Sequence, residues 1–329
     1  MINLKGAYIL LLYPYGATKH YGESIKSELI KRGAIVIGYD ERPSQNPIVK
    51  VIIRLFKKKL PGIFSSYVRS IILKNRDVDF DYILVLRGEA FTEKAVNILK
   101  GHYKKAKIIL YLWDVLKSTH LQDVIPYFDK SLSFDPEDVS ENNGLLFRPT
   151  FFMPQYKNLI KDSMPKYEIL FVGTLHSNRY QLLKTIKEYL IQKGITHYYY
   201  LYTPSLLAFI KNKYIDKIPV KIKDVHFQPI TMNRTLQLVS KSKCILDLNF
   251  TGQKSLSMRA YEAMASRTKY ITTNPEVKNY GFYNPKNILV IEINNIYIPK
   301  DFLNTPFEEV SEEILNEYSI SCLVDDLFT

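Results

Sequence analysis

The sequence has only two cysteines, Cys244 and Cys322, in 329 residues. They form no CxxC pair or other ligand-like cluster, which argues against a disulfide scaffold or a cysteine-bound metal and indicates reduced thiols. Long apolar runs are also lacking: none approaches the roughly 18 residues that a membrane-spanning helix needs, and the N-terminus shows no signal-peptide cleavage pattern. We therefore expect a cytoplasmic protein.

Two motifs of α/β enzymes are missing as well. The first loop, YPYGATKHYG, lacks the GxGxxG spacing of a dinucleotide-binding turn. The acidic stretch DVDFD at residues 77–81 precedes an expected strand, whereas the metal-binding acids of a DxD motif follow one; we interpret it as a solvated lead-in. What the chain does have is a net charge of +12, which indicates an anionic partner such as a nucleotide, a nucleic acid or a lipid surface.

Short β-rich runs alternate with helix-like stretches along the whole chain. The expected strands are Ala7–Tyr13, Ala34–Tyr39, Tyr82–Arg87, Lys107–Trp113, Lys130–Phe134, Leu145–Phe151, Glu168–Gly173, Tyr198–Tyr202, Val225–Gln228, Cys244–Asn249, Lys269–Thr273 and Ile288–Ile291. Continuous apolar runs are typical of strands buried on both faces of a parallel sheet, and the spacers are long enough for crossover helices. The pattern predicts an α/β protein with two Rossmann-like, doubly wound parallel-sheet domains in series.

Two prolines and mixed charges interrupt this pattern at residues 151–167. We predict an N-terminal domain over residues 1–155 and a second domain over residues 156–310. The tail, residues 311–329, is predicted to be helical and to cross back to the first domain.

The segment SLSMRAYEAMASRTKYITTN, residues 255–274, follows an expected strand and is the first candidate site. Before its helix it supplies Ser255, Leu256 and Ser257, and hydroxyls beside free N–H groups at a helix N-terminus suit a phosphate. Arg259, one turn in, can add a charge-assisted bond to the same phosphate, and Glu262 is placed to accept ribose hydroxyls. The alternative is an Arg259–Glu262 pair on the helix surface, with Ser255 or Ser257 as the N-cap.

Two further strand ends in the same half carry similar chemistry. In YEILFVGTLHSNRY, Gly173 lets the backbone approach a ligand, Thr174 follows it, and Arg179 near the next helix suits a diphosphate. The alternative there is a turn glycine and a solvated arginine. In HFQPITMN, Gln228 and Ile230 end another expected strand, where a nucleobase can lie against backbone groups. Together the three loops offer contacts for base, ribose and diphosphate.

The pattern FVGT…R…(S/T)-x-x-x-R-x-(Y/F)-E-A followed by ITTN resembles the C-terminal half of GT-B-fold glycosyltransferases, in particular the capsular-polysaccharide and spore-maturation (CgeB-like) group. DYILVLRGEAFT, KIILYLWDVLKS and PYFDKSLSFDPEDV are similar to N-terminal segments of that group, so the resemblance spans nearly the whole chain. It implies that Glu262 binds the donor ribose, that Ser255, Ser257 and Arg259 bind the diphosphate, and that Gly173, Thr174 and Arg179 line the donor cleft.

The resemblance implies an enzyme that transfers a sugar from a nucleotide sugar, with UDP as the assumed carrier. The acceptor would be a saccharide or an undecaprenyl-diphosphate-linked saccharide of bacterial surface polysaccharide: capsule, lipopolysaccharide O-antigen or exopolysaccharide. No metal and no cofactor besides the nucleotide-sugar co-substrate is expected. Many retaining members carry a second glutamate eight residues before the ribose-binding one; Lys254 occupies that position here, so the stereochemical outcome is not implied.

The first domain is expected to hold the acceptor. An inverting enzyme needs a general base on the acceptor hydroxyl, which contributes roughly 10²–10⁴-fold in rate. Glu89 in LRGEA and Asp114 in LWDV follow expected strand ends and are the first and second candidates, with His20 of the first loop as the third. The alternative for each is a helix cap or a turn residue.

Residues 49–76 contain eight lysines and arginines and no acid, with apolar residues at helical spacing on both sides of Pro61–Gly62. Basic amphipathic helices bind anionic membrane surfaces. This predicts peripheral contact with the inner face of the plasma membrane through residues 49–76, near a lipid-linked acceptor. The alternative is a core helix with a solvated basic face.

Two other functions stay open at this stage. Asp40 and Glu41 follow the second expected strand, where a ribose-binding acid would lie in a nicotinamide-dependent, Rossmann-type sugar-nucleotide oxidoreductase. The charge and the abundant tyrosines are compatible with a non-catalytic nucleic-acid-binding protein, but no RNA- or DNA-binding motif is present.

Overall fold

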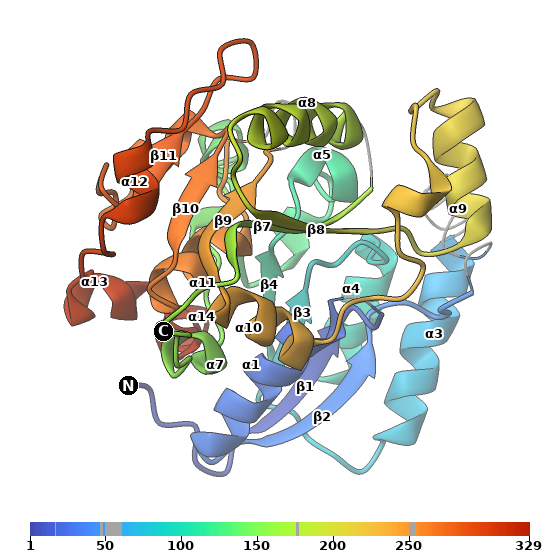
Figure 1. Ribbon diagram of the computed structural model, residues 1–329. Helices are drawn as coiled ribbons and strands as arrows, with labels where there is room; N and C mark the ends of the chain where they lie inside the picture. Colours follow the sequence, from blue (N-terminus) through green and yellow to red (C-terminus); the bar gives the residue numbers. More distant parts are fainter. Residues whose placement is uncertain (17, 47–48, 50–60, 176–177, 250–253) are drawn as a thin grey trace. The chain divides into compact units, whose positions relative to one another are not determined.

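The computed structural model describes residues 1–16, 18–46, 49, 61–175, 178–249 and 254–329. The chain forms two compact units, each with its own parallel sheet and hydrophobic core (Figure 1). The N-terminal unit comprises Met1–Thr150 together with Ile320–Thr329, and the C-terminal unit comprises Phe151–Ser319. The predicted two-domain α/β class is confirmed by these two sheets.

The sheet of the N-terminal unit has the strand order β2-β1-β3-β4-β5-β6, and all its pairings are parallel. Its strands are β1 (Tyr8–Tyr13), β2 (Ile35–Asp40), β3 (Tyr82–Leu86), β4 (Lys107–Leu112), β5 (Lys130–Ser133) and β6 (Leu146–Phe147). The helices are α1 (Lys19–Lys31), α3 (Pro61–Lys74), α4 (Glu93–His102), α5 (Leu116–Thr119), η2 (Ile125–Tyr127), α6 (Pro136–Glu141) and α14 (Ile320–Phe328). β1 runs in register with β2 from Tyr8↔Ile35 to Tyr13↔Asp40, so the two strands end together.

The sheet of the C-terminal unit has the order β11-β10-β9-β7-β8, again with parallel pairings. Its strands are β7 (Tyr167–Thr174), β8 (His197–Tyr202), β9 (Ser242–Asp247), β10 (Lys269–Thr272) and β11 (Ile288–Val290). The helices are α7 (Pro154–Lys157), α8 (Arg179–Gln192), α9 (Leu206–Ile210), η3 (Lys211–Ile215), η4 (Ile222–Asp224), α10 (Met232–Ser240), α11 (Met258–Ala265), η5 (Pro275–Asn279), α12 (Lys300–Asn304) and α13 (Glu312–Glu317). β9 is central, β10 and β7 flank it, and β8 and β11 form the edges.

Local sequence explains most of these elements. β3 is the apolar run YILVL, and all of it except Tyr82 is buried, as expected for a central parallel strand. α4 begins where the Thr92 hydroxyl accepts a hydrogen bond from the Ala95 N–H at 3.3 Å, and it buries Ala95, Val96 and Leu99 on one face. Among the described residues, every expected strand except Val225–Gln228 overlaps an observed one.

The unit boundary lies a few residues from the predicted one. Phe151, Phe152 and Met153 are buried, and the Phe152 N–H donates to the Tyr318 carbonyl at 3.0 Å, so residues 151–155 belong to the C-terminal unit. The predicted tail divides: α13 stays with that unit, and only α14 belongs to the N-terminal unit.

α14 completes the N-terminal unit by packing against α1. Its buried residues are Ile320, Leu323, Val324, Leu327 and Phe328, which largely follow helical i, i+3, i+4 spacing. The Asp325 carboxylate accepts from the Arg32 guanidinium and from the Ile2 N–H, both at 2.6 Å.

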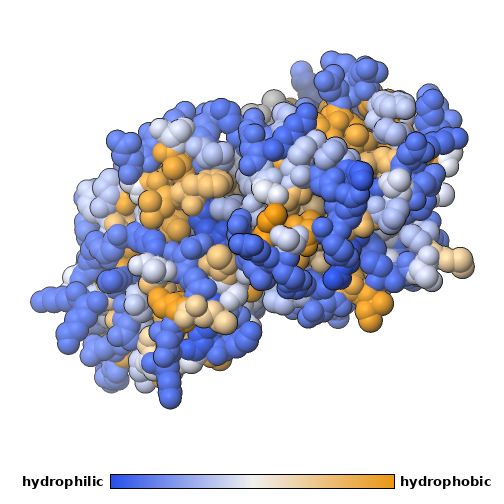
Figure 2. Space-filling model, turned by 90° about the vertical axis from the view of Figure 1, so that its left-hand side faces the viewer, coloured by the Kyte–Doolittle hydropathy of each residue, from blue (hydrophilic) through white to orange (hydrophobic). Residues whose placement is uncertain are grey.

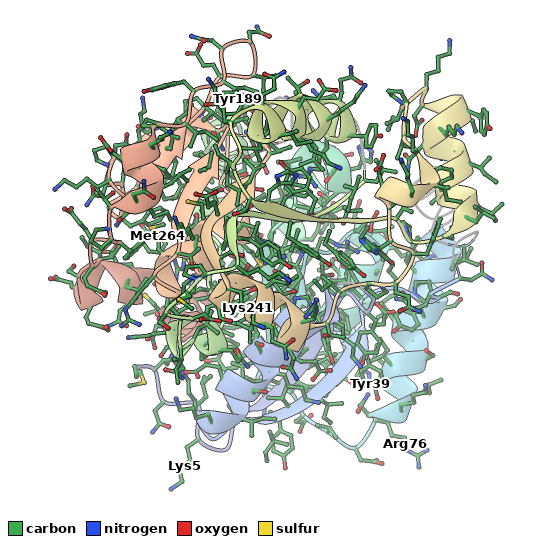
Figure 3. All side chains as sticks on the ribbon, viewed as in Figure 1. Lys5, Tyr39, Arg76, Tyr189, Lys241 and Met264 are labelled. Carbon is green, nitrogen blue, oxygen red and sulfur yellow. The ribbon has the colours of Figure 1, made fainter. Side chains whose placement is uncertain are left out.

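The surface shown in Figure 2 is mostly hydrophilic, with hydrophobic side chains in small separate groups. In Figure 3, Lys5 and Arg76 extend away from the ribbon, whereas Met264 of α11 is a buried side chain. None of the helices in the described part of the chain combines the length and the apolarity needed to cross a bilayer.

Candidate functional site

The carboxyl end of β9 carries an acid that organises its surroundings. The Asp247 Oδ2 accepts hydrogen bonds from the hydroxyls of Ser257 and Tyr270, both at 2.7 Å. Ser257 is the N-cap of α11, and its Oγ accepts from the Arg259 N–H at 3.2 Å. Asp247 therefore joins the end of β9 to β10 and to the start of α11. Sequence reasoning missed it, although an acid ending the apolar run CIL was a usable signal.

The backbone just before α11 is held by Asn274, the last residue of the ITTN motif. Its buried side-chain amide donates to the carbonyls of Ser255 at 3.1 Å and Lys254 at 3.3 Å. Ser255 and Leu256 are themselves buried, so of the three predicted loop residues only Ser257 presents a partly exposed side chain. The preceding loop residues, 250–253, lie outside the described residues.

Arg179 bridges the carboxyl ends of the neighbouring strands β7 and β9. Its guanidinium donates to the Thr174 carbonyl at the end of β7, at 3.1 Å, and to the Leu248 carbonyl just after β9, at 3.0 Å. Gly173 makes room for it: a Cβ there would lie 3.5 Å from the Arg179 Nη1 and 2.7 Å from the Phe171 ring. The glycine thus accommodates side chains of its own unit, which is a different use from the predicted close approach of a ligand.

The charge of Arg179 has little local compensation. Within the described part of the chain, no carboxylate lies at salt-bridge distance from its guanidinium, and its buried Nε has no hydrogen-bond partner. Burial lowers the pKa of Arg179, and the charge of Asp247 offsets this only in part. A cation held by carbonyl oxygens beside the N-terminus of α11 favours an anion at this edge of the sheet.

Arg259 and Glu262 form an ion pair, but not on the helix surface. The Arg259 Nη1 donates to the Glu262 Oε2 at 2.5 Å and to the Tyr156 hydroxyl of α7 at 3.1 Å. Glu262 is 0% and Tyr156 1% exposed, and burial, with the Glu262 charge, raises the pKa of Tyr156. The alternative of a pair on the helix surface is therefore wrong in its location. The predicted ribose contact requires this pair to open, because Glu262 has no exposed surface here.

Gln228 and Ile230 lie beside the edge strand β8. The Tyr200 hydroxyl donates to the Gln228 carbonyl at 2.8 Å, and the Tyr200 ring stacks on His226 at 4.0 Å. The segment adds a single parallel bridge, Tyr202↔His226, instead of the expected strand. These residues lie on the β8 side of the sheet, while Arg179 and Asp247 lie at β7 and β9.

In the N-terminal unit, three buried charged side chains and the partly exposed Arg87 meet at the ends of β2 and β3. The Arg87 Nε donates to the Glu41 Oε1 at 2.8 Å, and the Arg87 Nη2 lies 2.9 Å from the Glu89 Oε2. The Glu89 Oε2 also accepts a hydrogen bond from Arg42. The Glu89 N–H donates to the Glu41 Oε2 at 3.1 Å. Arg87 and Gly88 both have positive φ, at 71° and 69°, so the chain turns sharply to bring these groups together.

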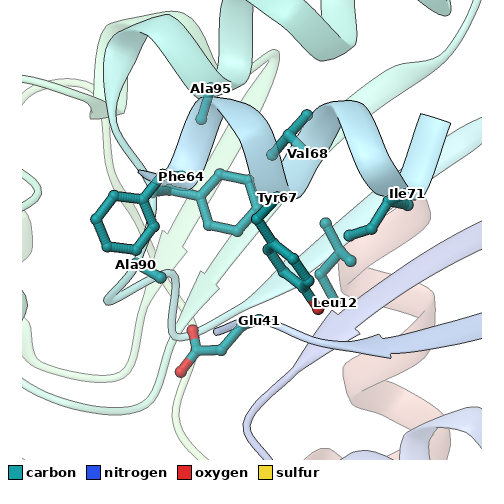
Figure 4. A pocket seen from close by; sticks show the side chains of 9 residues that line it. Leu12, Glu41, Phe64, Tyr67, Val68, Ile71, Ala90 and Ala95 are labelled. Atoms are coloured by element: carbon teal, nitrogen blue, oxygen red, sulfur yellow. The ribbon is translucent and has the colours of Figure 1, made fainter. Parts of the chain in front are cut away.

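This network corrects the first choice of general base. Glu89 is buried and bound by two guanidinium groups, so its carboxylate is not free to take a proton from an acceptor hydroxyl. Figure 4 shows Glu41 beside a small cavity lined mainly by apolar side chains such as Leu12, Phe64 and Ala90. Burial raises the pKa of Glu41, against the opposing charges of Arg87 and Arg42.

The same contacts weigh against a dinucleotide site in this unit. Glu41 is 1% exposed and belongs to the ion network, and Asp40 accepts from the backbone N–H groups of Tyr15 at 3.3 Å and Arg42 at 3.2 Å. Of the two acids that could have bound a nicotinamide ribose, Asp40 therefore holds the residues that follow β1 and β2, and Glu41 holds the turn that follows β3.

Asp114 and His20 are the accessible candidates. The Asp114 side chain is 48% exposed and lies 3.6 Å from the Arg87 Nη1. His20 is exposed in the first turn of α1, its ring 4.1 Å from Tyr21, and the Tyr21 ring lies edge-on to Trp113 at 6.5 Å. The structure thus brings an imidazole, two aromatic rings and a carboxylate to the carboxyl ends of β1 and β4.

The basic stretch is described only in part, because residues 50–60 lie outside the described residues. Its second half is α3, which buries Phe64, Val68 and Ile71 in the core of the N-terminal unit. For this half, the core-helix alternative is confirmed. In the DVDFD lead-in, the Asp81 Oδ2 accepts from the Tyr8 N–H at 2.8 Å, a structural contact.

Solved structures resemble the chain over nearly its whole length. The UDP-GlcNAc 2-epimerase of Methanocaldococcus jannaschii matches with a TM-score of 0.52 and 12% sequence identity, over 97% of this chain and 99% of the epimerase chain. A second structure of that enzyme, in complex with UDP-GlcNAc and UDP, matches with a TM-score of 0.50 and 13% identity, over 98% of this chain and 99% of the epimerase chain. Acinetobacter baumannii MurG matches with a TM-score of 0.51 and 10% identity, over 98% of this chain and 99% of the MurG chain. The chain has the GT-B fold.

TarM matches with a TM-score of 0.50 and 15% identity over 80% of this chain, which spans just over half (56%) of TarM. No family model and no curated protein matches the sequence. The GT-B fold accounts for the two parallel sheets of the chain.

Proposed function

We propose that the protein is a glycosyltransferase that moves a sugar from a nucleotide-sugar donor to a saccharide or lipid-linked saccharide acceptor. The C-terminal unit binds the donor, and the N-terminal unit binds the acceptor. One observation carries the proposal: Arg179 and the Ser257-capped N-terminus of α11 converge at the carboxyl ends of β7 and β9, where an open parallel sheet binds its ligand.

The transfer breaks the bond between the anomeric carbon and the diphosphate oxygen and forms one to the acceptor oxygen. The diphosphate leaves with the electron pair of the broken bond, and Arg179 and the α11 N-terminus stabilise its growing charge. In an inverting reaction, the acceptor hydroxyl loses its proton to Asp114 or His20, the two accessible groups at the carboxyl edge of the first sheet. Lys254 leaves the stereochemistry of the product undetermined.

Donor binding is tested by thermal shift with UDP, GDP, dTDP and CMP, with NAD(P) as the comparison. We expect a nucleoside diphosphate, UDP first, to raise the melting temperature. Arg179→Ala should weaken that nucleotide roughly ten- to hundredfold, the loss of one charge-assisted hydrogen bond. Arg267→Ala, which removes an exposed arginine paired with Glu309, is the matched control. The proposal would be excluded if NAD(P) raised the melting temperature and none of UDP, GDP, dTDP and CMP did.

Turnover tests the predicted donor contacts. Glu262→Ala and Arg259→Ala should each abolish most transfer. Because Glu262 is buried, each variant is first compared with the wild type in melting temperature without nucleotide. Unchanged turnover in both would contradict a donor role for this pair.

A second candidate is a nucleotide-sugar epimerase, favoured by the likeness to UDP-GlcNAc 2-epimerase. The two reactions separate cleanly in deuterated water. Epimerisation at C2 breaks the C2–H bond, so it incorporates solvent deuterium into UDP-GlcNAc without any acceptor. A transferase leaves C2 unlabelled and releases UDP in step with an added acceptor.

The resemblance to the CgeB-like group supports a role in bacterial surface polysaccharide synthesis, with an undecaprenyl-diphosphate-linked acceptor. Separately, the eight lysines and arginines of residues 49–76, with no acid among them, support peripheral membrane contact through this stretch. If neutralising Lys57, Lys58 and Lys59 leaves co-sedimentation with anionic vesicles unchanged, this contact is not made by that stretch.

A further inference from the structure

The segment Leu206–Lys223 of the C-terminal unit, which we term the apolar–basic hairpin, has an outward face that the core does not use. Figure 1 shows its first part, α9 and the turn after it, in yellow beyond the end of β8. Six large apolar side chains on it are exposed: Leu206, Leu207, Ile210, Tyr214, Ile215 and Ile222. Leu207 and Ile215 are 78% and 72% exposed, so most of the surface of each residue is in contact with solvent.

The hairpin is anchored by a different set of residues. Phe209, Ile218 and Val220 are buried in the core of the C-terminal unit, and the Ser205 hydroxyl caps α9 by accepting from the Ala208 N–H at 3.1 Å. These contacts hold the hairpin on the C-terminal unit, and none of them involves the six exposed apolar side chains. The outward face is therefore not explained by folding, and exposed apolar groups of this size mark an interaction surface.

Helical spacing gathers the exposed side chains. α9 continues directly into the π-helical turn η3, so Leu207, Ile210 and Tyr214 follow one another at three and four residues along the same side. The helical turn ends at Ile215 with Asp216 as its C-cap, and Lys217, with φ at 53°, turns the chain. The face thus projects at the edge of its unit, beside β8.

The charge of the hairpin is almost entirely positive. It contains Lys211, Lys213, Lys217, Lys221 and Lys223 but only one acid, Asp216, so five positive charges less one negative leave a net charge of +4. Asp216 is paired with Lys211 at 2.8 Å. Lys213 lies 5.3 Å from the centre of the Tyr214 ring, which keeps a cation directly beside the apolar face.

The mixture of lysine with leucine, isoleucine and tyrosine on this face indicates which kind of partner it binds. The buried centres of protein–protein interfaces are depleted in lysine, whereas helices on a membrane surface place lysine at the headgroups and apolar side chains below them. We propose that the apolar–basic hairpin docks on an anionic lipid bilayer, with its exposed apolar side chains in the interface and its lysines on the headgroups. This surface is distinct from residues 49–76 and does not depend on the proposed reaction.

Co-sedimentation with vesicles tests the proposal on the whole protein. We expect binding to vesicles of phosphatidylcholine with phosphatidylglycerol and little binding to phosphatidylcholine alone. Lys213→Gln/Lys221→Gln/Lys223→Gln should weaken binding roughly a hundredfold, because each lysine near an anionic surface contributes several-fold. The matched control, Lys94→Gln/Lys104→Gln/Lys105→Gln, removes the same charge from exposed sites in the other unit and should bind as the wild type does.

The apolar contribution has its own pair of variants. Leu207→Ser/Ile215→Ser should reduce binding, whereas Ile160→Ser/Met164→Ser, at two side chains that are equally exposed in the same unit, should not. In a Trp113→Phe background, Tyr214→Trp should shift its fluorescence to the blue on anionic vesicles, and Tyr297→Trp, another exposed site, should not.

Three results would overturn the proposal. The first is wild-type protein that does not bind anionic vesicles. The second is binding lost only when Lys57, Lys58 and Lys59 are neutralised, with the hairpin variants unaffected. The third is a concentration-dependent dimer that Leu207→Ser/Ile215→Ser abolishes, which would assign the face to a second copy of the chain.

Discussion

Gly22 in α1 lies against the ring of the buried Tyr13, and the absence of a side chain makes this contact possible. A Cβ at position 22 would lie 2.1 Å from the Tyr13 Cδ2. We therefore predict that Gly22→Ala destabilises the protein by about 1–3 kcal/mol, the usual cost of overpacking a core. The control is Gly101→Ala in α4, where a Cβ meets nothing within 4 Å and should stabilise slightly. Urea unfolding of both variants checks this.

Lys161 is a residue-scale source of pH dependence. Its ammonium group donates to the carbonyls of Val239 and Ser242 and to the Thr268 hydroxyl, and burial lowers its pKa to about 8 from the ordinary 10.5. Between these two values the unfolded chain binds the proton more tightly than the folded protein does. This group therefore makes the protein more stable as the pH rises from about 8 to 10.5.

Comparison with Lys161→Met isolates the effect, because other titrating groups are common to both proteins. We predict that the stability of the wild type relative to the variant increases between pH 7 and pH 10, by on the order of 3 kcal/mol. Urea midpoints at the two pH values measure it. A constant difference between the two proteins would show that Lys161 stays charged in the fold throughout.

At the scale of elements, Asp325 joins α14 to α1. Burial alone would raise the pKa of Asp325, but the hydrogen bonds from Arg32 and the Ile2 N–H lower it below its ordinary 3.8. This stabilisation is present above pH 3.8 and is lost as the pH falls through the folded-state pKa.

We predict that Asp325→Asn lowers the free energy of unfolding at pH 7 by about 1–2 kcal/mol, and that the difference from the wild type shrinks below pH 4. Thermal unfolding across this pH range measures it. Asp77→Asn, which breaks the exposed Arg76–Asp77 pair, should change little at any pH. A deficit for Asp325→Asn that persists in acid would mean the amide disturbs the packing instead.

The strands were predictable because each is a short apolar run, and such a run specifies burial on both faces of a sheet. Val225–Gln228 failed because only its bridge at His226 pairs with β8. α9 and η3 were missed because all their large apolar side chains except Phe209 face solvent, so no buried stripe marked them.

The candidate site was predictable only in its local parts. Ser257 as an N-cap and Arg259 three residues before Glu262 follow from the sequence of α11. Tyr156, which helps to bury that pair, precedes Arg259 by 103 residues. Arg42, which binds the Glu89 carboxylate, precedes Glu89 by 47 residues. Contacts at such separations depend on how the elements pack, and one sequence does not specify that packing residue by residue.

At the scale of the whole molecule, two separate cores predict two separable responses to ligand. The single tryptophan, Trp113, lies in the N-terminal unit, while the proposed nucleotide site lies in the C-terminal unit. UDP at a hundred times its Kd should stabilise the C-terminal unit by about 2.7 kcal/mol. We predict a rise in the calorimetric transition of that unit, with the tryptophan fluorescence midpoint unchanged. Equal shifts by both probes would indicate that the two units unfold together.

The membership of α14 in the N-terminal unit has a consequence for biosynthesis. The ribosome makes the whole of residues 151–319 after β6 and before α14, yet Leu323, Val324 and Leu327 fill the core beside α1. During translation, the surface of the N-terminal unit that α14 covers therefore stays exposed until residues 151–319 have been made. During this interval the open site offers a binding surface to chaperones, and a pause in translation would lengthen the exposure.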